Sequence, residues 1–474
     1  FPAAAAAWRI SDEAFMAATT KYLDNLKLRL SYGTTGSDAI NANLWRETWE
    51  LGGLTGYTIG GEQDNGRPYQ PGTMMANPNL KWESTASANI GLDFGFFNSR
   101  LRGSIDVYQS TTTNLLMPVA VNSTSGYSFQ YQNVGVVSNK GVELSIGGDI
   151  VRTKDFLLSA NFIYSYNDNK IEELSPSLMQ TKYGVSWASN AGRPSNEYVL
   201  KEGYAIGTIT GYHYLGWYDP VNDFDYANGV YTLKTGITDW DFGTYPNKFQ
   251  KATGQKAFPG ALKIADLDNN GRLTEDDYEI IGEMRAKSTG SFTVNAKYKN
   301  FDFATNFNYV IGGLIFNVDG MASTFGNKDN DLGANRLKRV ATAFSPYKIE
   351  NGELVFVQDP QELINMNANA TMATPTTELG ILTDQYIEDG SFLRLKNLTL
   401  GYTLPQNISK KFKASNLRIY ITGTNLLTFT RYTGLDPEVN TTANNGAYGF
   451  PTINRDNGAY PISKTFTFGL NVTF

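Results

Sequence analysis

The sequence predicts an all-β protein, a transmembrane antiparallel β-barrel to which this chain contributes about eleven strands. Three features lead to this prediction: the strict alternation of apolar and polar residues, the regular alternation of long and short connections, and the aromatic end of the last strand. Together they predict a location in a bacterial outer membrane, with lipid around the barrel.

Residues 465–474 show the alternation most clearly, because apolar side chains there alternate with small or polar ones up to Phe474. Successive side chains of a strand point to opposite faces, so this segment has one apolar and one polar face. Its length matches the roughly 9–11 residues that a tilted strand needs to cross a bilayer. Taken alone, the alternation also fits a soluble β-protein. The same pattern predicts strands near residues 3–10, 25–33, 83–96, 101–110, 139–150, 156–167, 290–298, 302–311, 391–403, 416–427 and 464–474.

The connections between these strands separate the two alternatives. Outer-membrane barrels have long extracellular loops and short periplasmic turns, whereas a soluble sandwich has no reason to place every long loop at one end. The long connections are 34–82, 111–138, 168–289, 312–390 and 428–463, and the short ones are 97–100, 151–155, 299–301 and 404–415. The first and last strands then run in the same direction, so we expect a separate N-terminal piece of the barrel to pair with both edges.

Composition excludes several classes of function. The net charge is −6 without a long run of Lys or Arg, so we expect no nucleic-acid partner. Cysteine is absent, which excludes thiolate chemistry, disulfides and cysteine-ligated zinc. The single histidine, His213, has no neighbouring nucleophile and orienting carboxylate in the sequence, so we expect no catalytic residues and no enzyme. A hydrolase would require His213 as its base, and packing among aromatic residues is the expectation for this side chain.

Other aromatic residues of the long connections, such as Trp217, Tyr218 and Trp240, have two interpretations. Their rings could stack on sugars or on peptide side chains, or they could pack the connection itself. We expect packing.

Residues 266–277, within the long extracellular connection 168–289, follow the spacing of an EF-hand loop. A bound Ca²⁺ would take oxygen ligands from the loop, and Gly271 would permit its sharp turn. Asp at position twelve replaces the longer Glu, and no clear helix precedes the loop, so a metal-free turn rich in Asp and Asn is the alternative. The predicted ligands are Asp266, Asp268, Asn270, the backbone carbonyl of Arg272, and Asp277.

Several motifs occur in order along the whole chain: NPNLKWE at 77–83, NVG at 133–135, NKGVEL at 139–144, GSFLRLKNLTLGY at 390–402, NLRIY at 416–420, TNLL at 424–427 and GLDPE at 434–438. Together they resemble the motifs of SusC-like TonB-dependent transporters of the SusC/RagA family of Bacteroidetes. The resemblance implies a barrel of about 22 strands, of which residues 1–474 are the C-terminal portion. Acidic loops similar to 266–277 recur in this family, which supports a structural Ca²⁺.

The resemblance also implies a function and partners. An oligosaccharide or peptide would be captured under a SusD-like surface lipoprotein and imported when the TonB–ExbB–ExbD complex pulls on a plug. The family's plug and TonB box have no counterpart in the sequence, so the plug is expected on the separate N-terminal piece. A passive porin, or a surface-binding barrel without TonB coupling, is the alternative function. The substrate-binding residues are not predicted.

Overall fold

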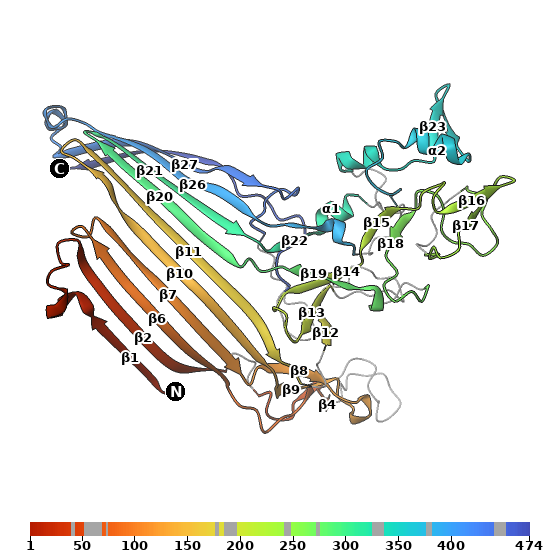
Figure 1. Cartoon of the computed structure of the whole chain (residues 1–474), viewed down its shortest axis with the longest axis horizontal. Helices are drawn as coiled ribbons and strands as arrows, with labels where there is room; N and C mark the ends of the chain where they lie inside the picture. Colours follow the sequence, from red (N-terminus) through yellow and green to blue (C-terminus); the bar gives the residue numbers. More distant parts are fainter. Residues whose placement is uncertain are drawn as a thin grey trace.

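A curved sheet of eleven antiparallel strands is the frame of the molecule in the computed structural model (Figure 1). The strands pair in chain order, each with the next, as in an up-and-down barrel wall. They are β1 (Ala3–Arg9), β2 (Leu23–Ser37), β6 (Glu83–Phe96), β7 (Leu101–Thr113), β10 (Val136–Arg152), β11 (Phe156–Glu173), β20 (Ser288–Tyr298), β21 (Phe301–Ile311), β26 (Phe392–Thr403), β27 (Asn416–Thr430) and β29 (Thr465–Thr473). The structure describes residues 1–38, 43–51, 69–72, 74–175, 180–183, 197–240, 248–271, 275–324, 336–375, 382–439 and 452–474.

Each of the eleven predicted strands corresponds to one strand of this sheet, which confirms the predicted fold class. The largest differences lie at strand ends. β11 continues to Glu173, beyond its predicted end at residue 167, and β2 continues to Ser37, beyond its predicted end at residue 33. These extensions consist mainly of polar residues, because they lie where the alternation that marks a bilayer-spanning strand fades.

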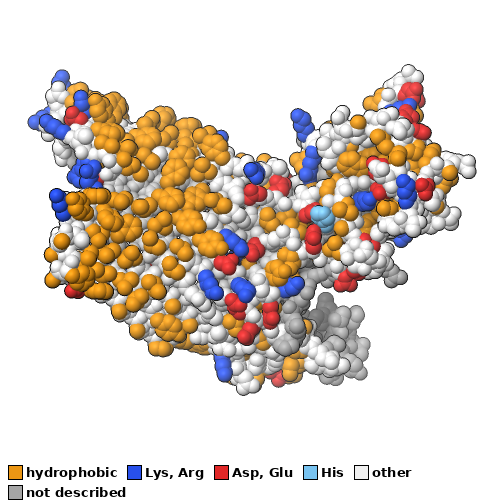
Figure 2. Space-filling model, in the orientation of Figure 1, with side chains coloured by type: hydrophobic (Ala, Val, Ile, Leu, Met, Phe, Trp, Pro, Cys, Tyr) orange, Lys and Arg blue, Asp and Glu red, His pale blue; other side chains and the backbone are white. Residues whose placement is uncertain are grey.

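The register places the apolar residues of neighbouring strands on one face of the sheet. Ile90 of β6 pairs with Leu30 of β2 and with Val107 of β7, and all three side chains are exposed. On the last strand, Phe468 is 78% exposed. Figure 2 shows hydrophobic side chains gathered over the strands of this sheet. A broad exposed apolar face on a barrel wall is the face that contacts lipid.

The opposite face carries polar and charged residues that pair with one another. Arg29 Nη2 lies 2.9 Å from Asp93 Oδ1 and 2.8 Å from Asp106 Oδ2, which joins β2, β6 and β7. Arg418 of β27 donates through Nε to Asp302 Oδ1 of β21 over 2.9 Å. Because isolated charges are costly in lipid, this face is the inner wall of the barrel.

Short connections lie at one end of the sheet and long ones at the other (Figure 1). The turn between β6 and β7 has Phe97, Asn98 and Ser99 at positive φ, and the turn between β20 and β21 has Lys299 at positive φ. The connection from β26 to β27 contains the helix α3 (Gln406–Ser409). The predicted asymmetry of the connections is therefore confirmed for the described residues.

The long connections fold into small sheets instead of extending freely into solvent. They include the helices α1 (Val318–Ala322) and α2 (Pro360–Met366). A four-stranded sheet consists of β12 (Gln180–Tyr183), β13 (Tyr198–Lys201), β14 (Thr208–Gly211) and β19 (Glu279–Glu283). The remaining strands are β3 (Trp49–Leu51), β4 (Tyr69–Pro71), β5 (Met74–Met75), β8 (Leu116–Ala120), β9 (Phe129–Asn133), β15 (Tyr214–Trp217), β16 (Phe224–Ala227), β17 (Val230–Leu233), β18 (Leu262–Ile264), β22 (Leu314–Asn317), β23 (Tyr347–Glu350), β24 (Glu353–Phe356), β25 (Ile387–Asp389) and β28 (Arg455–Asp456).

Two buried apolar clusters lie at this end of the molecule. The first cluster joins the ends of the long strands to several connections and includes Val137, Ile171, Ile209, Phe316 and Leu382. The second cluster is aromatic and lies farther from the sheet, around β15 to β18. Burial of apolar side chains is the main stabilising contribution to such a module.

No helix among the described residues is both long and apolar enough to cross a membrane. Within the described part of the chain, the large sheet ends at β1 on one side and at β29 on the other. Both edge strands run toward the short-turn end, as Figure 1 shows.

Candidate functional site

Three backbone segments that are distant in the sequence lie side by side in the folded module that the long connections form. Gly211 at the end of β14 pairs with Glu279 at the start of β19. On the other side, Tyr212 forms a parallel bridge with Thr383. The Tyr212 N–H donates to the Leu382 carbonyl over 2.9 Å, and the Asp384 N–H donates to the Tyr212 carbonyl over 3.1 Å. This hydrogen-bonded framework determines where the side chains at its end meet.

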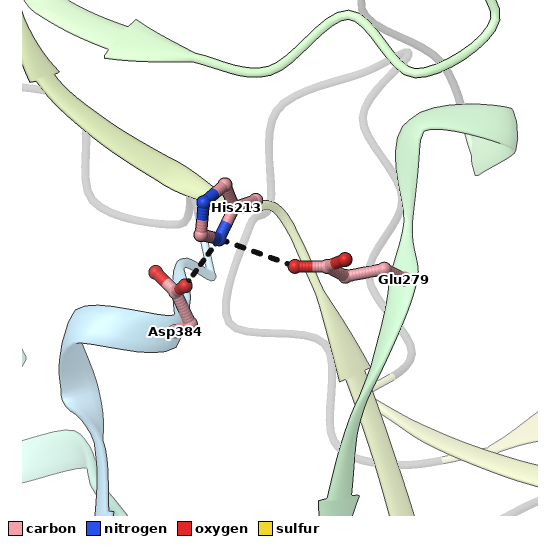
Figure 3. A group of neighbouring side chains, drawn as sticks. All are labelled: His213, Glu279 and Asp384. Carbon is pink, nitrogen blue, oxygen red and sulfur yellow. Dashed lines mark hydrogen bonds and ion pairs between the residues drawn. The ribbon is translucent and has the colours of Figure 1, made fainter.

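His213, Glu279 and Asp384 converge at that end (Figure 3). The His213 Nδ1 atom lies 2.7 Å from Asp384 Oδ2 and 3.2 Å from Glu279 Oε1. Asp384 is oriented by its second oxygen, because Oδ1 accepts a 3.0 Å hydrogen bond from the Tyr214 N–H. The side chains of His213, Glu279 and Asp384 are 46%, 41% and 27% exposed, so solvent reaches the cluster.

The environment of His213 differs from the expected one. Packing among aromatic residues was predicted, but its ring nitrogen lies between two carboxylates instead. Sequence reasoning missed these partners because Asp384 is 171 positions away and because Asp and Glu are too frequent to be singled out. The described residues place no Ser, Thr or Tyr hydroxyl in a hydrogen bond with the His213 ring.

The acidic loop predicted from the EF-hand spacing lies next to this cluster, since the Ala265 N–H donates to the His213 carbonyl over 3.1 Å. Carboxylate oxygens of Asp266, Asp268 and Asp277 lie within 4.8 Å of one another. Asn269 and Gly271 adopt positive φ values of 57° and 73°, which turn the chain sharply between these ligands. Three of the five predicted ligands are therefore brought together.

Asp266 is the most constrained member of the loop. Its Oδ2 accepts hydrogen bonds from Thr238 Oγ1 over 2.8 Å and from the Gly271 N–H over 3.0 Å. Its Oδ1 is buried and has no hydrogen-bond partner among the described residues. Burial disfavours ionisation of Asp266, but the hydrogen bonds from Thr238 and Gly271 outweigh it and lower the pKa of the carboxyl.

The predicted ligands Asp277, Asn270 and Arg272 differ in burial and in their hydrogen bonds. Asp277 is fully buried and accepts a 3.0 Å hydrogen bond from the Leu267 N–H through Oδ1. Asn270 lies beside Asp268, to which its side-chain amide donates. Arg272 lies outside the described residues. Asp, Asn and backbone oxygens suit a hard cation such as Ca²⁺.

The aromatic residues of the same region pack against each other. Tyr218 and Trp240 are buried in the aromatic cluster, and Trp240 Nε1 donates to the Ile264 carbonyl over 2.8 Å. Trp217 lies 6.3 Å from Phe344 between ring centroids. Packing was the expected role of Trp217, Tyr218 and Trp240, and the structure confirms it.

A cavity of about 440 Å³ opens where the inner face of the sheet meets the connections. It is lined in part by Asn167 and Asn169 of β11, Lys287, Glu438 and Asn454. These side chains offer both donors and acceptors, together with both signs of charge.

Comparison with known proteins finds TonB-dependent receptors both by family model and by sequence identity. Residues 1–232 match the family model of the TonB dependent receptor-like β-barrel. The TonB-dependent receptor P3 of Formosa agariphila is 33% identical over 474 residues, which are 100% of this chain and 42% of the relative. The TonB-dependent receptor SusC of Bacteroides thetaiotaomicron is 27% identical and is covered to 40% of its length.

A solved structure of the RagAB peptide transporter has the same fold. It superimposes on 100% of this chain with a TM-score of 0.70 and 24% identity, and the match covers 43% of that structure's chain. The present chain thus spans well under half the length of the relatives that it matches, at 40–42%.

Proposed function

We propose that the chain is part of the β-barrel of a SusC-like TonB-dependent receptor of the outer membrane and that it serves the import of oligosaccharides or peptides. The observation that carries the proposal is the two-faced sheet of eleven strands, apolar outside and ion-paired inside. A wall with these two faces separates lipid from a polar lumen. Further barrel strands would pair with the edges β1 and β29.

Active transport requires a plug and a source of energy in addition to the barrel wall. A barrel of about 22 strands encloses a lumen that must be plugged, so import through it requires energy coupling to the plug. In this proposal the plug, on the N-terminal piece, receives the pull of TonB–ExbB–ExbD, and a SusD-like lipoprotein covers the extracellular module. The matched relatives are receptors and transporters by name, which supports a carrier and not an enzyme.

Uptake measurements test the proposal. Deletion of the gene for the whole protein should abolish growth on one class of oligosaccharide or peptide, and growth should return with the intact gene. Uptake should stop when the proton-motive force is collapsed. Uptake that survives this treatment would support the passive porin, the alternative function. Co-purification of a lipoprotein with the whole protein tests the partner separately.

We propose further that the loop 266–277 binds Ca²⁺ in a structural role. Support comes from the clustered carboxylates of Asp266, Asp268 and Asp277 and from the buried Asp266 Oδ1, which faces no other donor among the described residues. Asn270 and the Arg272 carbonyl complete the expected oxygen set. The ion would stabilise the connection between β18 and β19.

The calcium site is tested by thermal unfolding of the whole protein with EDTA and with increasing Ca²⁺. At ten times the dissociation constant, a bound ion stabilises the folded module by about 1.4 kcal/mol. Asp266→Asn should abolish the shift. Asp276→Asn is the matched control, since it removes a charge from the same loop but outside the carboxylate cluster. Equal calcium shifts in the wild type and in Asp266→Asn would refute the site.

A further inference from the structure

In the cluster of His213, Glu279 and Asp384, two separate ion pairs to the imidazole do not fully explain the positions of the two carboxylates. Both carboxylates approach the same ring nitrogen, Nδ1, at 2.7 Å and 3.2 Å (Figure 3). A protonated Nδ1 carries one hydrogen, so it can point that hydrogen fully at only one of the two oxygens. A species with two or more coordination positions would satisfy both oxygens at once.

The separations fit a metal ion. Nitrogen and carboxylate ligands bind Zn²⁺ and similar ions at about 2.0–2.2 Å, so neighbouring ligand atoms of one ion lie about 3 Å apart. The donor atoms of His213, Glu279 and Asp384 all lie within 4.8 Å of one another, and the two contacts at Nδ1 are close to the ligand spacing. A small movement of side chains that are still partly exposed opens a common position for the ion.

The ligand types select the class of ion. One imidazole and two carboxylates suit first-row transition metals, whereas Ca²⁺ and Mg²⁺ prefer oxygen ligands only. The exposure of the cluster leaves room for water at the remaining coordination positions. The site is therefore chemically distinct from the oxygen-only loop 266–277.

Backbone hydrogen bonds hold the framework behind the cluster. His213 and Glu279 are held by the pairing of β14 with β19, and Asp384 by the bridge between Tyr212 and Thr383. The Tyr214 N–H fixes the Asp384 carboxylate from behind, the kind of outer hydrogen bond that orients metal ligands. Figure 3 shows the side chains of Glu279 and Asp384 approaching the His213 ring from different sides.

We propose that His213, Glu279 and Asp384 form a binding site for a divalent transition-metal ion, with Zn²⁺ as the probe. The ion links two extracellular connections: His213 and Glu279 belong to the one between β11 and β20, and Asp384 to the one between β21 and β26. Its effect is to hold these connections together at the barrel mouth. The inference does not depend on what is transported.

The test uses the whole protein, without a polyhistidine tag, purified in detergent and stripped of metal with EDTA. Zn²⁺ is titrated by calorimetry in the presence of excess Ca²⁺, which occupies oxygen-only sites. The wild type should bind one equivalent more than His213→Ala. Asp384→Asn, which keeps the shape of the side chain, should weaken that equivalent at least tenfold. Asp225→Asn, which removes an exposed carboxylate of β16 outside both carboxylate clusters, is the control and should bind Zn²⁺ as the wild type does.

A second measurement guards against misfolding of the variants. Co²⁺ in place of Zn²⁺ gives a visible absorption that depends on its ligands, and this absorption should change in His213→Gln while the thermal unfolding of the metal-free protein stays the same. Equal Zn²⁺ binding by the wild type and His213→Ala would overturn the proposal. Loss of the equivalent in Asp268→Asn instead would also overturn it, because the ion would then lie in the acidic loop.

Discussion

Replacement of Arg394 by Met should detach the segment that follows β27 from the inner face of the sheet. Arg394 lies on β26 with a side chain that is 2% exposed, and its guanidinium pairs with both Asp436 and Glu438. Nη1 donates to Glu438 Oε2 over 2.9 Å, and Nη2 donates to Asp436 Oδ1. Methionine fills a similar volume but leaves both carboxylates without this cation.

The magnitude follows from the burial of the two acids. Removal of one partner of a buried ion pair costs about 3–5 kcal/mol, because the remaining charge stays desolvated. The Asp436 side chain is 12% exposed, whereas Glu438 is 41% exposed and keeps a second partner, Lys396, at 2.8 Å. Most of the loss therefore comes from Asp436, and we expect a destabilisation near the lower end of the range, about 3 kcal/mol. Lys396→Met is the matched control, expected to cost under about 1 kcal/mol as a partly exposed pair.

The pH dependence gives a second, independent readout. Burial raises the pKa of Asp436, but the hydrogen bond from Arg394 and those from the N–H groups of Glu438 and Ile462 outweigh it and lower the pKa overall. A lowered pKa in the folded state means stability that is present above the unfolded pKa and is lost as the pH falls through the folded one. The difference between wild type and Arg394→Met should therefore shrink in acid.

The assay is urea unfolding of the whole protein in lipid vesicles, combined with limited proteolysis of the segment 431–439. Arg394→Met should lower the free energy of unfolding by about 3 kcal/mol, as breakage of a buried pair predicts, and should expose this segment to protease at neutral pH. A loss no larger than that of Lys396→Met, with unchanged proteolysis, would refute the reasoning that this ion pair holds the segment.

Three further predictions test other parts of the structure. Phe468→Arg, on the face assigned to lipid, should lower the free energy of unfolding in vesicles by about 2–4 kcal/mol, whereas Thr467→Arg on the opposite face should have little effect; equal losses would contradict the assignment of the faces. Trp240→Ala should cost about 3–5 kcal/mol in the aromatic cluster and raise protease sensitivity near residue 240, and a neutral result would show that this cluster does not hold the module together. Burial raises the pKa of Tyr386 from 10.0 to about 12, so this residue alone should lower the stability of the module by about 3 kcal/mol as the pH rises from 10 to 12. Burial also raises the pKa values of Tyr218, Tyr231 and Tyr432, so Tyr386→Phe should reduce the pH dependence in pH-resolved thermal unfolding by that share, and an unchanged dependence would contradict the contribution of Tyr386.

The strands of the large sheet could be predicted because the membrane determines the polarity of each residue along a strand. Each strand separates lipid from a polar interior, so its pattern is local and period-two, as in Thr465–Thr473. Their ends at the long connections were less predictable, since the last residues of β11, which ends at Glu173, are mainly polar and show no apolar face.

The acidic loop could also be predicted, because its ligands are close in sequence and the spacing alone brings Asp266, Asp268 and Asp277 together. The cluster of His213, Glu279 and Asp384 could not. Its members come from three segments whose neighbourhood depends on the pairing of β14 with β19 and on the bridge between Tyr212 and Thr383. The small sheets of the long connections escape prediction for a similar reason, since strands such as Thr208–Gly211 are too short to show a period.

The long connections act as one folded module, which changes how substitutions in them should be interpreted. Apolar residues from the ends of β10 and β11 share a buried cluster with residues from several connections. Buried polar pairs join the same parts: Arg455, in the connection between β27 and β29, lies 3.7 Å from Glu197, and Tyr432 donates to Asp456. A change in one connection therefore affects the others through shared packing. A substitution can therefore assign ligand binding to a loop residue only if the module stays folded in the variant. The two proposed metal sites, one within a connection and one between two connections, would allow the stability of the module to be changed without a substitution, by adding or removing the ion.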